Sequence, residues 1–120
     1  MEKNTIKLTA GSKTFTATLA DNSSAKALKE LLAKEDISIN MRDYANMEKV
    51  GTLVTTLPRN DEYITTSVGD LILYQGNQFV IYYAPNTYSF TRLGKIDNTK
   101  REELLSALGN GDVTVLLSIN

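Results

Sequence analysis

The sequence predicts a mainly β protein, a closed eight-stranded barrel capped by two short α-helices. Apolar and polar residues alternate with a period of two over most of the 120 residues, which is typical of half-buried strands. Two short segments instead place leucines three or four residues apart, as amphipathic helices do. Many short antiparallel strands avoid exposed edges best by closing into a barrel, whose open ends two helices can cover. An open sheet with one helical layer is the competing layout.

The N-terminal part predicts a hairpin followed by a helix. Between Ile6 and Leu19, apolar and polar residues alternate on both sides of a turn that contains Gly11. Asn22 or Ser23 can cap the helix that follows. The apolar face of this helix consists of Ala25, Leu28, Leu31 and Leu32.

The next part of the chain is less regular. Residues 37–41 alternate and predict a strand. Residues 42–51 fit neither a helical nor a strand period, so we expect an irregular connection with some short structure. Residues 52–57 form a Thr-rich apolar run that predicts another strand, and residues 59–62 predict a polar loop.

The second half of the chain carries the clearest strand pattern. Strands at 71–74 and 79–83 flank a four-residue loop that contains Gly76, a residue suited to a tight bend. Both faces of 79–83 are largely apolar, which predicts a central strand covered on both sides. Residues 88–96 predict a further strand, in which Gly94 indicates a bulge or a close backbone approach.

The C-terminal part predicts a second helix and a last strand. Thr99 and Glu102 have the spacing of a capping box, and Gly109 ends the helix. Its apolar side consists of Leu104, Leu105 and Leu108. Residues 113–119 alternate again and predict the final strand.

The composition excludes several kinds of chemistry. The chain fits one domain, residues 1–120, and its formal net charge of −1 gives no electrostatic reason to bind nucleic acid. Because there is no Cys and no His, thiolate nucleophiles, Ser–His couples and ordinary zinc sites are ruled out. We therefore expect no metal and no cofactor.

A membrane partner is not expected either. The N-terminal residues lack the continuous apolar stretch of a signal peptide, and no segment approaches the roughly eighteen apolar residues of a membrane span. We expect the chain as it stands to be cytoplasmic, and a leader removed from it would change that expectation. The sequence does not indicate an oligomeric state.

Four segments of the chain together resemble a known family. They are ADNSSAKALKELL (20–32), INMRDYANMEKVG (39–51), GDLILYQGNQFVIYYAPNTYSFTRLGKI (69–96) and GDVTVLLSI (111–119). In this order and spacing, they look like the bacterial cyclophilin-like domain family, a group of small and mostly uncharacterised proteins. The resemblance covers nearly the whole chain and implies a closed eight-stranded barrel capped by two helices.

A weaker similarity reaches the true cyclophilins, which are peptidyl-prolyl isomerases. Residues 78–81, Gln-Phe-Val-Ile, resemble their Gln-Phe-Phe-Ile strand, and residues 94–96, Gly-Lys-Ile, resemble their Gly-Lys-Val. Those enzymes place an arginine against the prolyl amide, beside an apolar pocket with His and Trp contacts. This chain has no His and no Trp, and Arg42 lies near the right part of the chain without the surrounding pattern.

The tyrosine-rich strands supply most of the candidate ligand-binding residues. Tyrosines with one wet end often line pockets, and Tyr82 and Tyr88 are such candidates; alternatively they are only strand and core residues. Arg92 can grip a carboxylate or phosphate. The alternative for Arg92 is a salt bridge to Glu48 or Asp70.

Two further candidates come from the irregular segment. Tyr44 and Glu48 are four residues apart there, and irregular backbone on a rigid barrel commonly displays binding groups. The acidic pair Asp61 and Glu62 is interpreted as a solvated loop tip rather than a metal site. The predicted pocket therefore consists of Tyr44, Glu48, Tyr82, Tyr88 and Arg92.

Three hypotheses about function follow. The first, which we favour, is a non-catalytic binding module whose pocket holds a small anionic ligand or an extended peptide. The second is a divergent peptidyl-prolyl isomerase, because rotation about a prolyl bond requires amide desolvation and one well-placed donor rather than a titrating residue. The third is a protein–protein interaction domain in which the tyrosines are purely structural.

Overall fold

The computed structural model describes residues 4–11, 13–44, 48–53, 55–97, 99–109 and 112–119, with the side chain of Tyr44 excluded. The strands are β1 (Thr5–Ala10), β2 (Lys13–Leu19), β3 (Ile37–Tyr44), β4 (Glu48–Thr52), β5 (Glu62–Thr65), β6 (Asp70–Tyr74), β7 (Gln78–Tyr82), β8 (Thr87–Ile96) and β9 (Val113–Ser118), and the helices are α1 (Ser23–Lys34) and α2 (Arg101–Leu108). Neither helix is long and apolar enough to cross a membrane.

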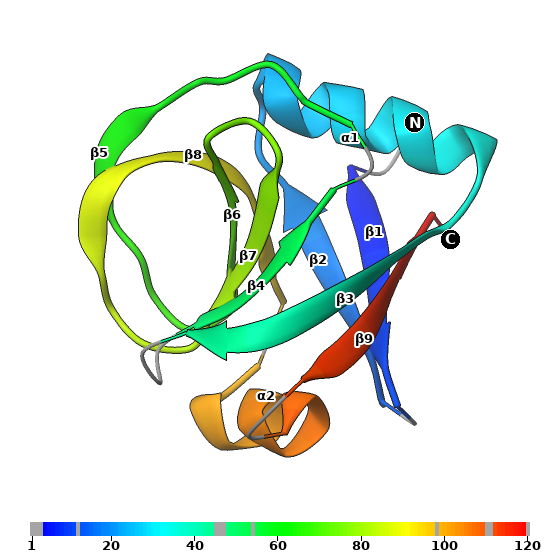
Figure 1. Cartoon of the computed structure of the whole chain (residues 1–120), viewed down its shortest axis with the longest axis vertical. Helices are drawn as coiled ribbons and strands as arrows, with labels where there is room; N and C mark the ends of the chain where they lie inside the picture. The colour runs from blue at the N-terminus through cyan, green and yellow to red at the C-terminus, as the bar shows by residue number, and fades with distance from the viewer. Residues whose placement is uncertain are drawn as a thin grey trace.

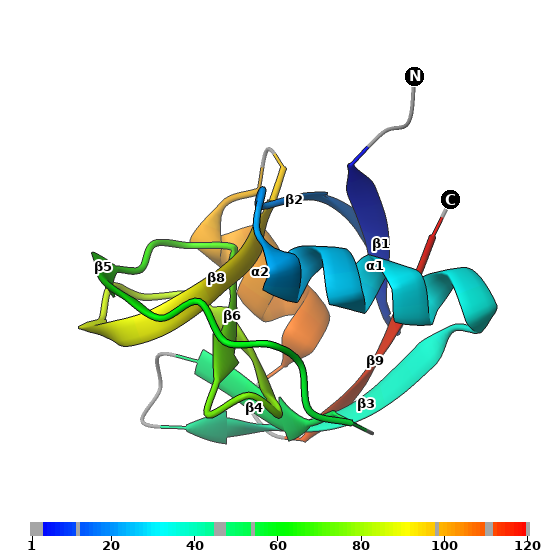
Figure 2. The same cartoon turned by 90° about the horizontal axis from the view of Figure 1, so that it is seen from above.

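Eight of the strands close into an antiparallel barrel (Figures 1 and 2). Their order is β2-β1-β9-β3-β4-β7-β6-β8, and pairing between β2 and β8 completes the circle. The ninth strand, β5, pairs with the first half of β8 outside this circle. The predicted fold class is confirmed, with β5 as an addition.

The wall formed by β6 and β7 is apolar on both faces, as the sequence predicted. Phe79, Ile81 and Tyr83 belong to the main core that fills the barrel. Because successive strand residues point to opposite faces, Val80 and Tyr82 point outward, where they join a second apolar cluster. The outer face of β6 and β7 therefore carries a second, smaller apolar core.

The two helices lie at opposite ends of the barrel (Figure 1). Leu28 of α1 and Leu104 of α2 are fully buried in the main core. Asn22 caps α1 as predicted, because its side-chain oxygen accepts a hydrogen bond from the Ala25 amide at 2.8 Å. The helices therefore close the barrel ends with their apolar faces.

The start of α2 differs from the predicted capping box. The N-cap residue is Lys100, which makes no side-chain cap bond. The Thr99 hydroxyl instead donates to the Lys100 carbonyl at 3.4 Å, so the helix begins one residue later than the box requires. Gly109 ends the helix as predicted, with a positive φ of 78°.

The expected irregular connection at 42–51 was wrong. β3 continues to Tyr44 and pairs with β4 in a hairpin, in which Arg42 is opposite Val50. Glu48 and Lys49 are adjacent and both buried, so the usual alternation of polar and apolar residues is lost. For this reason the sequence pattern did not indicate the regular strand β4.

The prediction of a strand at 52–57 was also wrong, because among the described residues of this range, which exclude residue 54, only Thr52 belongs to a strand, β4. Leu53 and Leu57 are buried without strand structure, and their amides donate to the backbone of the β6–β7 turn at 2.8 and 2.7 Å. β5 was missed because three of its four residues are exposed. An exposed edge strand leaves no alternating pattern to detect.

Gly94 lies both beside a bulge and at a close approach of two backbones, the two features that the sequence indicated. Leu71 is opposite Gly94 while Ile72 is opposite Arg92, so the register shifts between β6 and β8. A Cβ atom at Gly94 would lie 2.5 Å from the Thr18 carbonyl oxygen. This glycine therefore lets β8 bend and reach β2.

Replacement of Gly94 by alanine is expected to destabilise the barrel by about 2–3 kcal/mol, because the new methyl group would meet backbone atoms that cannot move independently. Urea unfolding followed by circular dichroism measures this change. Gly11→Asn is the control, because the space around Gly11 is open and asparagine tolerates its positive φ of 61°. Equal stability of Gly94→Ala and the wild type would contradict the account of barrel closure.

Candidate functional site

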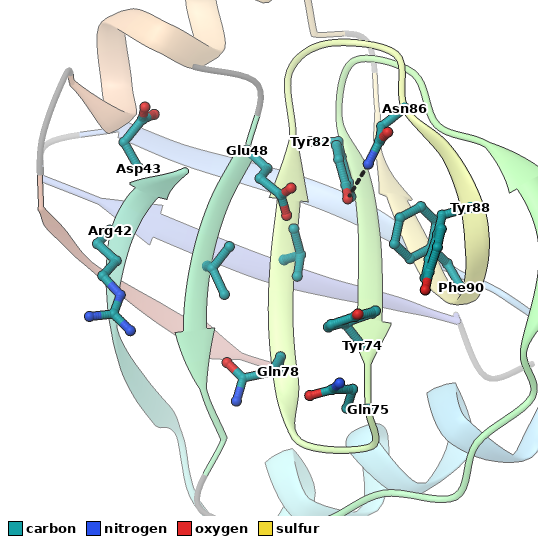
Figure 3. A pocket seen from close by; sticks show the side chains of 12 residues that line it. Arg42, Asp43, Glu48, Tyr74, Gln75, Gln78, Tyr82, Asn86, Tyr88 and Phe90 are labelled. Carbon is teal, nitrogen blue, oxygen red and sulfur yellow. Dashed lines mark hydrogen bonds between the residues drawn. The ribbon is translucent and has the colours of Figure 1, made fainter. Parts of the chain in front are cut away.

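A pocket of about 530 Å³ lies on the outer side of the barrel wall (Figure 3). β3, β4, β6, β7 and the β6–β7 turn supply one part of its lining, and the first half of β8 with the segment before it supplies the rest. The lining residues are Arg42, Asp43, Glu48, Val50, Tyr74, Gln75, Gln78, Val80, Tyr82, Asn86, Tyr88 and Phe90.

Aromatic side chains make up one side of this pocket. Phe90 is the buried centre of the group, with ring centroids 5.5 Å from Tyr82, 5.6 Å from Tyr88 and 6.1 Å from Tyr74. The ring planes are inclined by 56° to 64°, so the rings meet at tilted angles rather than in a parallel stack. They form inclined walls, and Tyr88 remains half exposed.

Glu48 is a buried carboxyl group in this pocket. Its residue is only 7% exposed and is directly opposite Tyr82 in the β4–β7 ladder. Burial raises the pKa of Glu48, and the negative charge of Asp43 raises it further, while a hydrogen bond with Tyr82 partly opposes the change. The Tyr82 hydroxyl also accepts a hydrogen bond from Asn86 Nδ2 at 3.2 Å. Burial likewise raises the pKa of Tyr82 well above its usual range.

The two charged residues of β3 have different environments. Asp43 Oδ1 lies 3.5 Å from Nζ of the fully buried Lys49 and accepts a hydrogen bond from the Tyr83 hydroxyl. Arg42, by contrast, is exposed, and its side chain forms no hydrogen bond or ion pair within the described part of the chain. Figure 3 shows Arg42 on the opposite side of the pocket from Tyr88.

A family model described as the cyclophilin-like family matches residues 8–118. The chain belongs to the cyclophilin-like family. A solved structure with a similar fold is the solution structure of the hypothetical protein AF2241 from Archaeoglobus fulgidus, with a TM-score of 0.64 and 11% sequence identity over 98% of this chain and 95% of that one. At this identity the likeness shows the fold alone. No curated protein matches the chain.

In this cyclophilin-like protein, Glu48, Tyr82 and Tyr88 come together in one pocket, although they come from three different strands. Ligand binding by these residues stays a prediction. Tyr44 pairs with Glu48 through its backbone, and its side chain lies outside the described residues.

Arg92 does not line the pocket that we expected it to join. Its guanidinium lies 3.4 Å from Oδ2 of the buried Asp70, which is one of the two salt bridges considered from the sequence. The register shift between Leu71 and Ile72 places Arg92 opposite Ile72. Gly94 indicated a bulge in this strand, but the residue that Arg92 then faces depends on tertiary pairing, so the sequence pattern did not reveal the position of Arg92.

Arg42, Gln78 and Asn86 line the pocket but were not among the predicted site residues. A signal for Arg42 was present in the sequence. Residues 37–41 alternate, and Met41 is buried in the core. Because successive strand residues point to opposite faces, extending the alternation by one residue puts Arg42 on the outer face. The signal was missed because the predicted strand ended at residue 41, three residues before the end of β3 at Tyr44.

Glu48→Gln is expected to raise the free energy of unfolding at neutral pH by about 0.5–1 kcal/mol. The folded-state pKa of Glu48 is above its unfolded value, so its ionisation costs stability as the pH rises through the folded pKa and costs nothing below the unfolded pKa. The gain should therefore vanish at about pH 3.5. Urea titrations at both pH values measure it. Glu62→Gln is the exposed control, and lower stability of Glu48→Gln at neutral pH would contradict this reasoning.

Proposed function

We propose that this cyclophilin-like protein is a non-catalytic binding module whose pocket receives one side chain of an extended peptide. The observation that carries the proposal is the combination of an apolar floor with hydrogen-bonding groups at its edge. Val50 and Val80 supply the floor, while Arg42, Gln78 and Asn86 supply donors and acceptors. A volume of about 530 Å³ is within the usual range for ligand pockets.

A neighbouring depression supports an extended ligand. A second cavity, of about 460 Å³, shares Arg42, Val50 and Gln78 with the first and continues toward Asn40 and Thr114. The two cavities adjoin along the outer faces of β3, β4 and β7. A peptide bound in the first cavity thus has a path for its flanking residues.

A small anionic ligand, the other expectation of our first hypothesis, has less support. Arg92, the cation expected to hold it, is paired with Asp70. Two carboxylates, Asp43 and Glu48, line the pocket, and they oppose a negative charge there. Arg42 provides one guanidinium, which suits a peptide carbonyl as well as an anion.

An interaction domain without a pocket also has less support. Large apolar side chains that are exposed among the described residues are Tyr63, Tyr88 and Leu116. They belong to β5, β8 and β9, and β9 is not a neighbour of the other two strands. They therefore do not suggest one contiguous apolar patch.

Titration of the isotope-labelled protein with acetyl-Gly-Ala-X-Ala-Gly-amide peptides tests the proposal. With X varied over apolar, aromatic, basic and acidic residues, at least one peptide should give saturable shifts of the Val50, Gln78 and Val80 amide signals in NMR spectra. Arg42→Ala should weaken that binding about tenfold. Arg92→Ala, which removes a guanidinium outside the pocket, should leave it unchanged. The proposal fails if no peptide shifts these signals at millimolar concentration.

Peptidyl-prolyl isomerase activity is the second candidate function. Arg42 lines the same pocket as Gln78 and Val80, which belong to the segment that resembles the cyclophilin Gln-Phe-Phe-Ile strand. An arginine beside an apolar floor can stabilise a twisted prolyl amide. The His and Trp contacts of true cyclophilins have no counterpart in a sequence without His or Trp.

In a protease-coupled assay with a proline-containing peptide, micromolar protein should give no rate above the uncatalysed isomerisation. The reason is that the proposed module binds its ligand without the full set of contacts that isomerases use. Arg42→Ala serves as the comparison. A clear rate with the wild type that Arg42→Ala abolishes would replace the binding-module proposal with the isomerase one.

A further inference from the structure

We infer that the side chain received by this pocket carries an alkylammonium group, as lysine and methylated lysine do, held between the aromatic side chains and the Glu48 carboxylate. This inference rests on the proposed function and specifies its ligand. It differs from both earlier expectations, because neither an anion nor a prolyl ring carries a positive charge.

The aromatic side of the pocket has the form of a cation site. Tyr74, Tyr82, Tyr88 and Phe90 come from three strands and meet at inclined angles around one side of a concave space. Ammonium groups are attracted to the electron-rich faces of such rings, and sets of inclined rings recognise alkylated ammonium ligands. The half-exposed Tyr88 leaves ring surface available to a ligand.

Glu48 supplies the matching negative charge. Its residue is 93% buried, since 7% is exposed, and it lines the pocket. No described residue forms an ion pair with it; its polar contact is with Tyr82. A buried carboxylate without a counter-charge is costly, and a ligand ammonium would supply that charge. Burial is the main cause of the raised pKa of Glu48, and a bound ammonium group would oppose that shift by favouring the charged carboxylate.

The other charges of the pocket are compatible with this ligand. Asp43, the second carboxylate, already has Lys49 as its partner. Arg42, which would repel an ammonium group, is on the opposite side of the pocket from Tyr88 (Figure 3). That separation suits a peptide whose cationic end lies among the rings while a backbone carbonyl accepts from Arg42.

The test compares peptides that differ in one group. Calorimetric titration of the full chain uses acetyl-Gly-Ala-X-Ala-Gly-amide with X as lysine, trimethyllysine, norleucine, proline or glutamate. Norleucine matches the lysine side chain in its carbon chain but lacks the charge. Lysine or trimethyllysine should bind at least about tenfold more tightly than norleucine. Tetramethylammonium chloride is the probe for a free ammonium ligand.

Three variants locate the effect. Glu48→Gln should reduce the preference for lysine over norleucine to about twofold or less, because the carboxylate charge is gone. Tyr88→Leu should weaken trimethyllysine binding about tenfold by removing a ring face. Tyr63→Leu is the matched control, since Tyr63 is a highly exposed tyrosine on β5 outside the pocket, and it should change nothing. Circular dichroism confirms that each variant is folded.

The outcomes separate the two proposals. Norleucine, proline or glutamate binding as well as lysine would overturn the ammonium inference and leave the peptide-binding module standing. An undiminished lysine preference in both Glu48→Gln and Tyr88→Leu would also overturn the inference. If no peptide binds but tetramethylammonium shifts the Tyr74 and Tyr88 ring signals, the ammonium site stands and the peptide proposal fails. If neither class of probe binds, both proposals fail.

Discussion

The close contact between β8 and β2 at Gly94 is the constraint on which the rest of the structure depends. The barrel closes only where the last residues of β8 lie between β6 and β2, and the absent side chain of Gly94 permits the approach to Thr18. The register shift lies beside Gly94, between Leu71 and Ile72, and the pairing of β8 with β6 continues to Leu73 and Thr91, where it ends. β8 therefore has two parts: residues 91–96 close the barrel, and residues 87–90 leave the barrel wall and pair with β5.

The departing half of β8 creates the site. It pairs with β5 and carries Tyr88 and Phe90 over the outer side of β6 and β7, where Phe90 contacts Tyr82. A wall with two apolar faces needs cover on both, and the barrel core covers only one. The β5–β8 ribbon covers part of the other face, and the pocket is the part that it leaves open.

The sequence predicted features that follow from local periodicity. Alternation indicated most of the strands, and Asn22 is one of the two residues, with Ser23, that were predicted to cap α1. The β3–β4 hairpin was missed because Glu48 and Lys49 are buried side by side, which no pattern of alternating polarity describes. The partner of Arg92 could be narrowed to two residues, but the choice of Asp70 depends on a register shift between strands. Three candidate residues lie together in the pocket because β4 pairs with β7, which puts Glu48 opposite Tyr82, and because the first half of β8 brings Tyr88 to the outer side of that wall.

The position of the first hairpin constrains when this chain can fold. β1 pairs with β9, and β2 pairs with the end of β8, so both outer partners of the β1–β2 hairpin come from the last third of the sequence. During synthesis this hairpin leaves the ribosome with two unpaired edges and keeps them until its partners in β8 and β9 have been made. Such long-range pairing slows folding. The edges of the β1–β2 hairpin therefore remain open to pairing with other chains while the intervening strands are made.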